Sequence, residues 1–182
     1  MIQTQEILRA IKGPILSWIS DQAAAMDWIP LRTSMIYVSA TSVWLEGDWT
    51  GLLPIGCKVR WKEGGNWLYA YVVAATYANN ATALTLRGNA MTGATITEAW
   101  YSYASNPRGF PQYFDYTPVV TAGTGSITSY TVNSARFCMQ GRRVVADVDF
   151  TITDKGTGSG VLYWSLPVSP AVGLAVGAGR EI

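Results

Sequence analysis

The sequence of 182 residues contains no histidine at all. Histidine is the usual general base near neutral pH, the usual partner of a serine or cysteine nucleophile, and the commonest metal ligand. Its absence removes most hydrolase mechanisms and most transition-metal sites. We therefore expect a protein that is not an enzyme and that holds neither a metal ion nor another cofactor.

Charged side chains are scarce as well. They make up 14% of the residues, against about 25% in an average soluble protein, while hydrophobic residues make up 49%. The 13 basic and 12 acidic side chains give a net charge of +1, which produces no long-range field to attract nucleic acid. We do not expect nucleic acid as a partner. A surface with so little charge is typical of a chain that other subunits partly cover, so the composition predicts an oligomer.

Cysteines and long hydrophobic runs are also few. Cys57 and Cys138 lie far apart and lack the spacing of a zinc site, so we expect two free thiols. No apolar run reaches the roughly 18 residues of a membrane span. Glu6, Arg9 and Lys12 interrupt the first segment, unlike the apolar centre of an export signal. The sequence predicts a chain that starts at Met1, does not insert into a membrane, and assembles in a reducing cytoplasm.

Residues 1–30 carry apolar side chains at spacings of three and four, which predict an amphipathic helical arm. Gly13 and Pro14 interrupt the pattern, and proline suits the start of a second helical piece. The apolar face either packs on the chain's own β structure or docks on a neighbouring subunit or a larger particle. We favour docking, since the remaining sequence predicts self-sufficient sheets. The candidate particle-docking residues are Ile7, Leu8, Ile11, Ile15, Leu16 and Ile19.

In residues 31–105 the period changes to two, as in strands with one buried face. The segment 57–62 alternates completely, which predicts inward side chains for Cys57, Val59 and Trp61 and outward cations at the positions between them. Turns are expected at residues 63–66 and at Asn79-Asn80. Short strands separated by such turns predict a small β-barrel.

Two prolines and a glycine in residues 106–112 predict a linker, and residues 113–182 predict a second β unit. The strand at residues 144–153 has apolar side chains at every second position from Val144 to Ile152, and polar side chains between them from Asp147 to Thr153. The glycine-rich run 156–160 is interpreted as a flexible hairpin loop that leads to the strand at residues 161–166. The predicted fold is therefore mainly β: an N-terminal amphipathic helical arm, a small β-barrel, and then an antiparallel, jelly-roll-like β-sandwich.

Paired carboxylates are the nearest approach to a catalytic motif. Asp147 and Asp149 share one face of a strand, roughly 7 Å apart, a separation that an inverting glycosidase uses. Glu46 and Asp48 flank a glycine. The sequence supplies no groove over either pair, so we interpret both as solvated or subunit-contacting side chains. The glycine run lacks the Lys-Ser or Lys-Thr and the helix of a phosphate-binding loop.

The aromatic content is high, with eight Trp and ten Tyr. Rings near loops on a rigid sheet can stack on the C–H face of a sugar, although aromatic residues also dominate cores and interfaces. Packing is the favoured interpretation, and stacking is kept as an alternative. Trp100 lies near a turn too. The candidate glycan-stacking residues are Trp44, Trp49, Trp67, Tyr77, Tyr113 and Tyr116.

Two groups of stretches between residues 35 and 168 carry a resemblance to known proteins. The first group comprises Leu45–Thr50, Gly56–Lys62, Trp100–Tyr103 and Asn106–Pro111. The second comprises Phe114–Pro118, Gly141–Thr153 and Gly156–Pro167. The first group resembles the small-barrel modules of tail fibres and other appendage proteins from tailed bacteriophages, and the second is similar to the β-sandwich modules that often follow them.

In that family the modules usually form trimers, some of which bind host surface glycan while others decorate the capsid. The resemblance therefore implies a virion structural protein, homotrimeric, exposed on the virion surface and attached to other virion proteins by its arm. It carries over no catalytic residue. The chain lacks the coiled coil or repetitive shaft of long fibres, which leaves a tail fibre, a spike, a tail tip and a capsid-decorating or head-fibre protein open. A small carbohydrate-binding, lectin-like module is the alternative.

Overall fold

The computed structural model of the chain describes residues 27–168. This part is mainly β, as predicted, and contains no helix that is long and apolar enough to cross a membrane. Residues 1–26 of the predicted helical arm, with its six candidate docking residues, lie outside the described residues. The strands are β1 (Ile29–Pro30), β2 (Met35–Ser39), β3 (Ser42–Glu46), β4 (Lys58–Glu63), β5 (Asn66–Ala78), β6 (Ala81–Gly88), β7 (Ile96–Ser102), β8 (Phe114–Asp115), β9 (Val120–Thr124), β10 (Ser129–Gln140), β11 (Arg143–Asp154) and β12 (Ser159–Trp164).

The first seven strands form one antiparallel sheet in the order β1-β7-β4-β5-β6-β3-β2. Two tight turns set the register of its centre. Gly64 and Gly65 join β4 to β5, Asn79 and Asn80 join β5 to β6, and all four residues have positive φ, the conformation of a two-residue hairpin turn. Both turns agree with the sequence prediction, and they place β5 between β4 and β6.

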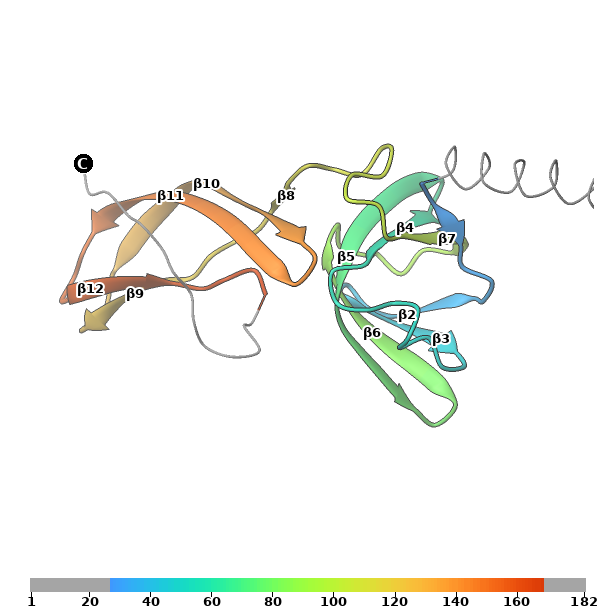
Figure 1. Cartoon of the computed structure of the whole chain (residues 1–182). Helices are drawn as coiled ribbons and strands as arrows, with labels where there is room; N and C mark the ends of the chain where they lie inside the picture. The colour runs from blue at the N-terminus through green and yellow to red at the C-terminus, as the bar shows by residue number, and fades with distance from the viewer. Residues whose placement is uncertain (1–26, 169–182) are drawn as a thin grey trace, which may run out of the picture.

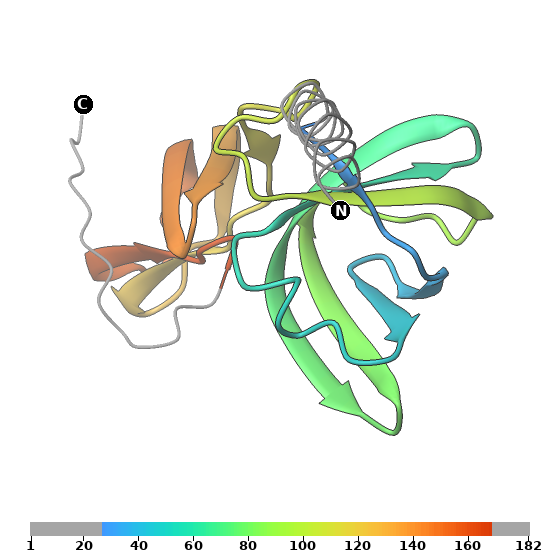
Figure 2. The ribbon, with the colours of Figure 1, turned by 45° about the vertical axis from the view of Figure 1, so that its right-hand side comes forward.

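The sheet curls around its own core, and Figure 2 shows the long β5–β6 pair bending across it. Cys57, Val59 and Trp61 are buried on the inner face, as predicted. The predicted closed barrel is an open half-barrel, because β1 and β2 end the sheet without pairing with each other in the described part of the chain. Other buried members of this core are Val43, Leu45, Leu53, Val72, Leu84, Leu86 and Met91.

The second unit contains two small sheets, a three-stranded one in the order β11-β10-β8 and a two-stranded one formed by β12 and β9. Their side chains meet where the rings of Phe150 and Trp164 lie 6.5 Å apart. The prediction of a hairpin at residues 156–160 is wrong, since β12 pairs with β9 and not with β11. The glycines let the chain change sheets: a Cβ on Gly156 would overlap the side chain of Thr128.

Aromatic side chains join the two units, which lie next to each other in Figure 1. We call the following six buried residues the bridging cluster. The ring of Tyr71, on β5, lies 5.0 Å from that of Phe110 and 5.6 Å from that of Phe114. Phe110 belongs to the predicted linker, which is therefore packed against both units. The bridging cluster consists of Trp28, Tyr71, Phe110, Phe114, Phe137 and Met139.

A backbone contact reinforces the bridging cluster. Gly56 precedes β4 with a φ of 89°, and an added Cβ there would overlap the carbonyl oxygen of Gly141, in the β10–β11 turn. Only glycine permits this approach of two backbones. The start of the first unit also lies earlier than predicted, because Ile29 and Pro30, assigned to the end of the arm, pair with β7.

Candidate functional site

The outer, convex face of the half-barrel carries the densest group of charged and aromatic side chains. The inner face holds the core, so alternation along each strand puts the remaining side chains outside. The registers of β4 with β5 and with β7 align these side chains in three rows. Along β5, β4 and β7, the rows are Tyr71, Lys58, Ser102; Tyr69, Arg60, Trp100; and Trp67, Lys62, Glu98.

The rows pass from buried to exposed. Lys58 points outward, as predicted, but the bridging cluster covers it there and leaves it 7% exposed. Its ammonium donates to the carbonyl of Ala104 at 3.0 Å and lies 5.7 Å from the ring centres of Tyr71 and Phe110. Burial lowers the pKa of Lys58. The first row is thus part of the contact between the units.

The second row centres on Arg60, which is surrounded by tryptophan. Its guanidinium carbon lies 4.7 Å from the ring centre of Trp28, 4.7 Å from that of Trp67 and 5.2 Å from that of Trp100. Each such contact is worth about 0.5–2 kcal/mol, more where water is excluded. Trp28 is held in turn by a 2.9 Å hydrogen bond from its indole nitrogen to the carbonyl of Arg108.

Arg60 has no acidic partner at hydrogen-bonding distance within residues 27–168. Its Nε is buried without a hydrogen-bond acceptor in this part of the chain. Burial lowers the pKa of Arg60, opposed by the charge of Glu98 among others, yet guanidinium stays protonated in proteins. The tryptophans therefore hold a permanent cation that forms no hydrogen bond to an acidic side chain of residues 27–168.

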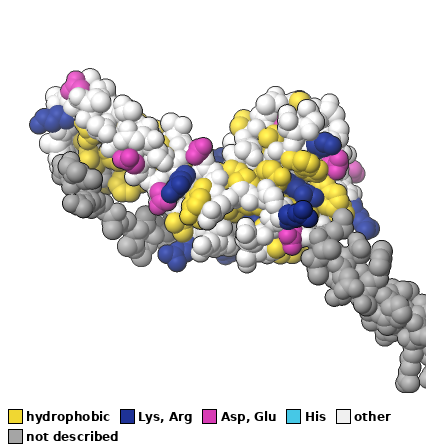
Figure 3. Space-filling model, turned by 90° about the horizontal axis from the view of Figure 1, so that it is seen from above, with side chains coloured by type: hydrophobic (Ala, Val, Ile, Leu, Met, Phe, Trp, Pro, Cys, Tyr) yellow, Lys and Arg dark blue, Asp and Glu magenta, His cyan; other side chains and the backbone are white. Residues whose placement is uncertain are grey.

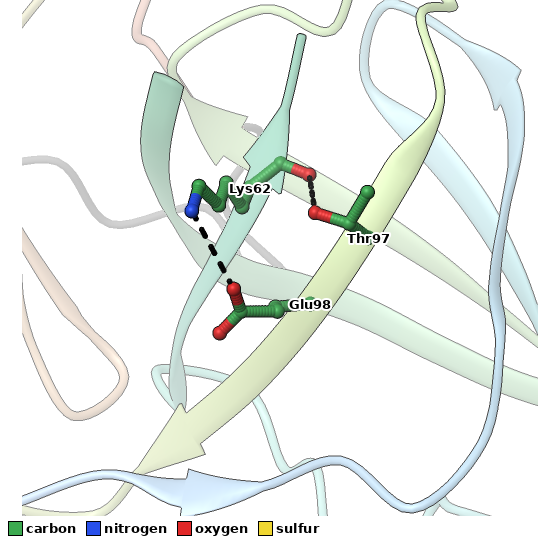
Figure 4. Close-up of polar contacts among 3 residues, drawn as sticks. All are labelled: Lys62, Thr97 and Glu98. Atoms are coloured by element: carbon green, nitrogen blue, oxygen red, sulfur yellow. Dashed lines mark hydrogen bonds and ion pairs between the residues drawn. The ribbon is translucent and has the colours of Figure 1, made fainter. Parts of the chain in front are cut away.

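The third row supplies the exposed edge of this face, and Figure 4 shows its polar contacts. The ammonium of Lys62 lies 3.6 Å from a carboxylate oxygen of Glu98, and both side chains are well exposed. The hydroxyl of Thr97 donates to the backbone carbonyl of Lys62 at 3.5 Å. Trp67 lies beside Lys62 and is 36% exposed. We call Trp28, Arg60, Lys62, Trp67, Glu98 and Trp100 the tryptophan–arginine face.

A shallow cavity adjoins this face at its β7 edge. Its volume is about 270 Å³, and Glu98 and Trp100 belong to its lining together with Pro30, Leu31 and Ile96. This volume lies just below the range of drug-sized pockets, so the cavity suits one small ring. Figure 3 shows Lys and Arg side chains directly among hydrophobic ones on the unit that contains this sheet.

The structure distributes the six predicted stacking residues over both units. Trp44 is exposed on the outer side of β3, far along the sheet from Trp67 at the start of β5. Tyr77 lies at the opposite end of β5 from Trp67. Tyr113 stacks on the guanidinium of Arg136 in the second unit.

Trp49 and Tyr116 are half-buried and pack on a core. The indole nitrogen of Trp49 donates to the carbonyl of Glu46 at 2.7 Å. Of the predicted set, only Trp67 belongs to the tryptophan–arginine face. Arg60 and Trp28 were missed. The Gly64-Gly65 turn predicts that residue 62 pairs with residue 67 and residue 60 with residue 69, and this register could have placed Arg60 near Trp67. It gives no signal for Trp28.

The remaining ionisable groups have structural partners. Asp147 forms an exposed ion pair with Arg136 at 3.5 Å, and Asp149 lies opposite Ser134. Burial acts to raise the pKa of Glu63, but hydrogen bonds from Trp61, Thr92 and Ala94 outweigh burial and lower it. Burial raises the pKa of the Cys57 thiol to about 11, which makes it a poor nucleophile at neutral pH.

Comparisons with protein-family models, with curated proteins and with solved structures find no match to this chain. The chemistry of the tryptophan–arginine face is therefore derived from its own geometry. That face combines flat apolar rings, a guanidinium that no described acidic side chain reaches at hydrogen-bonding distance, and a neighbouring ion pair. Such a surface can stack on a ring and donate hydrogen bonds to an anion.

Proposed function

We propose that the chain is a structural, self-associating subunit of a larger particle, and that it has no catalytic role. The resemblance to appendage modules of tailed bacteriophages supports a virion surface protein, assembled as a homotrimer. The distal part of the second unit is the observation that carries self-association. In this proposal, a neighbouring copy covers the apolar surface that the second unit leaves exposed in a single copy.

The distal part comprises β9 and β12, and every side chain of β12 is exposed. Val161 is 64% exposed and Tyr163 56% exposed. Val119, Leu162 and Leu166 add further exposed apolar surface around them. Contiguous apolar surface of this kind marks interaction sites on soluble proteins.

Charge distribution favours a second copy as the occupant. Residues 116–135 and 156–168 contain no Asp, Glu, Lys or Arg, so β9 and β12 are free of charge. A symmetric assembly brings identical surfaces of different copies near one another, and like charges there would repel. A charge-free apolar strand pair avoids this repulsion. Within residues 27–168, β9 and β12 pair only with each other, so the outer edge of each strand leaves backbone groups for pairing between chains.

Sedimentation velocity over a range of protein concentrations tests this proposal. The parent chain is expected at three times its 19.7 kDa chain mass. Val161→Lys and Tyr163→Lys are expected to shift it to the monomer, because each places a cation in the apolar contact. Ile36→Lys is the matched control, since Ile36 is 52% exposed on β2 of the other unit. A monomeric parent chain, or dissociation by Ile36→Lys alone, would contradict the proposal.

The N-terminal arm, which ends before the first unit begins at residue 27, is proposed to attach the subunit to other virion proteins. Replacing Ile11 or Ile15 with aspartate in the full chain is expected to leave folding and self-association unchanged, because both are proposed to contact the particle only. The variants should be absent from purified virions. Undiminished incorporation would refute attachment through this apolar face.

Carbohydrate binding is the second candidate function, either in a lectin-like module or at the host-facing end of an appendage. The observation that favours it is the tryptophan–arginine face, with Trp67 exposed beside a cation. An array of host surface glycans probed with the parent chain tests it. Binding that Trp67→Ala removes would favour this function, and a silent array would leave a purely structural role.

A further inference from the structure

We propose that the tryptophan–arginine face binds a carboxylate-bearing saccharide, with Arg60 as the carboxylate-binding residue and Trp67 as the stacking residue. This inference rests on the carbohydrate-binding candidate and is independent of self-association. It names a chemical class of ligand and a site that includes Trp28, Arg60 and Trp100, all outside the predicted stacking set.

The need for an anion follows from the surroundings of Arg60. Arg60 and Lys62 place two cations on the exposed rows of the face, and Glu98 is the one anion there. Glu98 pairs with Lys62 at 3.6 Å, so the charge of Arg60 is the one without a partner among the described side chains of this face. Guanidinium presents its N–H donors in one plane, in a fork that matches a carboxylate.

The tryptophans determine from which side a ligand can approach the guanidinium of Arg60. Trp28 and Trp67 each lie 4.7 Å from the guanidinium carbon, so ring surface occupies the space beside the cation. Trp28 is 4% exposed, whereas Trp67 is 36% exposed, which leaves the Trp67 side open to a ligand. Partial burial also makes a charge-assisted hydrogen bond at Arg60 stronger than one in open water.

The saccharide part of the ligand follows from the shape of the surface. A pyranose offers a flat apolar C–H face to an aromatic ring, and the exposed part of Trp67 provides such a ring. The adjacent cavity of about 270 Å³, lined in part by Pro30, Ile96 and Glu98, is large enough for one small ring. Lys62 and Glu98 are exposed at its side and can exchange their mutual contact for sugar hydroxyls. A uronic-acid-type residue combines both features.

Calorimetric titration of the full chain with a glucuronate oligosaccharide and with a glucose oligosaccharide of equal length tests the inference. The acidic ligand should bind at least tenfold more tightly than the neutral one. Arg60→Gln should abolish that preference, and Trp67→Ala should weaken binding at least tenfold. Trp44→Ala is the matched control, since Trp44 is 52% exposed on the same sheet and no Lys or Arg among the described residues lies over its ring. It should leave binding unchanged.

Glu98→Gln provides a test in which the affinity for the acidic ligand should rise. It removes the negative charge beside the site and releases Lys62, so the acidic ligand should bind two- to fivefold more tightly while the neutral one is unaffected. Loss of affinity in this variant would overturn the assignment. If Arg60→Gln does not fold, as a thermal melt would reveal, Trp67→Ala and Glu98→Gln carry the test.

The other outcomes are distinguishable. Equal affinity for the acidic and neutral ligands would overturn the acidic class and retain carbohydrate binding. No binding of either ligand would overturn both, without touching self-association. Displacement of the oligosaccharide by acetate at the same carboxylate concentration would overturn the saccharide and leave a simple anion site.

Discussion

The two units of this chain bury their apolar residues very differently. The curled sheet of β1–β7 encloses side chains such as Trp61 and Val43 completely. In the second unit, Val148, Phe150 and Ile152 point to the inner side of β11, yet all three stay partly exposed. The buried apolar side chains there include Phe114, Phe137 and Met139 of the bridging cluster, together with Val120 and Ala135.

The difference shows that alternation along a strand predicts which side chains point inward. It does not predict whether another sheet buries those side chains. β11 has the most regular alternation in the sequence, but a two-stranded sheet covers only part of its apolar side. The first unit is complete within one copy. The second is stabilised at one end by the first unit and, in our proposal, at its distal end by a neighbouring copy.

The largest expected difference between the two units is in the loss of unfolding free energy caused by Trp61→Ala and by Phe150→Ala. Trp61 is fully buried, so its removal should lower the free energy of unfolding by about 3–5 kcal/mol. Phe150 is partly exposed, and its removal should cost about 1–2 kcal/mol, since much of its surface is in water already. Urea titrations at low protein concentration measure both. Equal losses would show that the two cores are equally closed.

Gly56→Ala should break the connection between the units. The substitution strains a residue with positive φ and forces its Cβ against the Gly141 carbonyl, which together should cost about 2–4 kcal/mol. Gly51, in the same loop, has open space at this position, so Gly51→Ala is the control and should be nearly neutral. Thermal melts compare them, and a neutral Gly56→Ala would refute the close backbone contact.

Glu63→Gln should weaken the first unit alone. The carboxylate is 3% exposed and accepts hydrogen bonds from Trp61, Thr92 and Ala94, so losing it at neutral pH should cost about 1–3 kcal/mol. Because the folded-state pKa lies below the ordinary value of 4.5, the stabilisation is present above that value. It is lost as the pH falls through the folded-state pKa.

The free energies of unfolding of parent and variant should therefore converge as the pH falls through the folded-state pKa of Glu63. Denaturant titrations at a series of pH values follow the difference between them. A difference that stays constant from neutral to acidic pH would mean that the ionised carboxylate of Glu63 contributes nothing.

The smallest expected effect is a difference in labelling rate between the two cysteines, which requires no substitution. Cys57 is buried in the first core and its pKa is raised to about 11, whereas Cys138 on β10 is partly exposed. A thiol reagent should therefore modify Cys138 first, and Cys57 should react only as the first unit unfolds. Mass spectrometry of timed samples identifies the site, and early modification of Cys57 would contradict the closed core.

Local patterns predicted much of the fold. The alternation in residues 57–62 and the turns at Gly64-Gly65 and Asn79-Asn80 fix β4, β5 and β6, because each involves neighbours in sequence. Pairing between distant segments could not be predicted in this way. Neither the partnership of β12 with β9 nor the meeting of Trp28, Arg60 and Trp100 follows from any local pattern.

The burial of Lys58 likewise depends on distant segments and could not be predicted from the local pattern. Its position in the strand correctly predicted the outer face, but the bridging cluster that covers this face comes from residues 28, 110, 114 and 137. The predicted stacking residues were chosen for their nearness to turns. The structure instead groups aromatic residues by strand register, and so Trp67 gains Arg60 as a neighbour while Trp44 does not.

Hydrogen exchange of the full chain at low and high concentration tests most directly whether a second copy completes the distal part. The account predicts that amides of β9 and β12 gain protection as the concentration rises, while those of β4, β5 and β6 stay equally protected throughout. Protection of β9 and β12 that is independent of concentration would contradict it, as would a gain confined to the first unit.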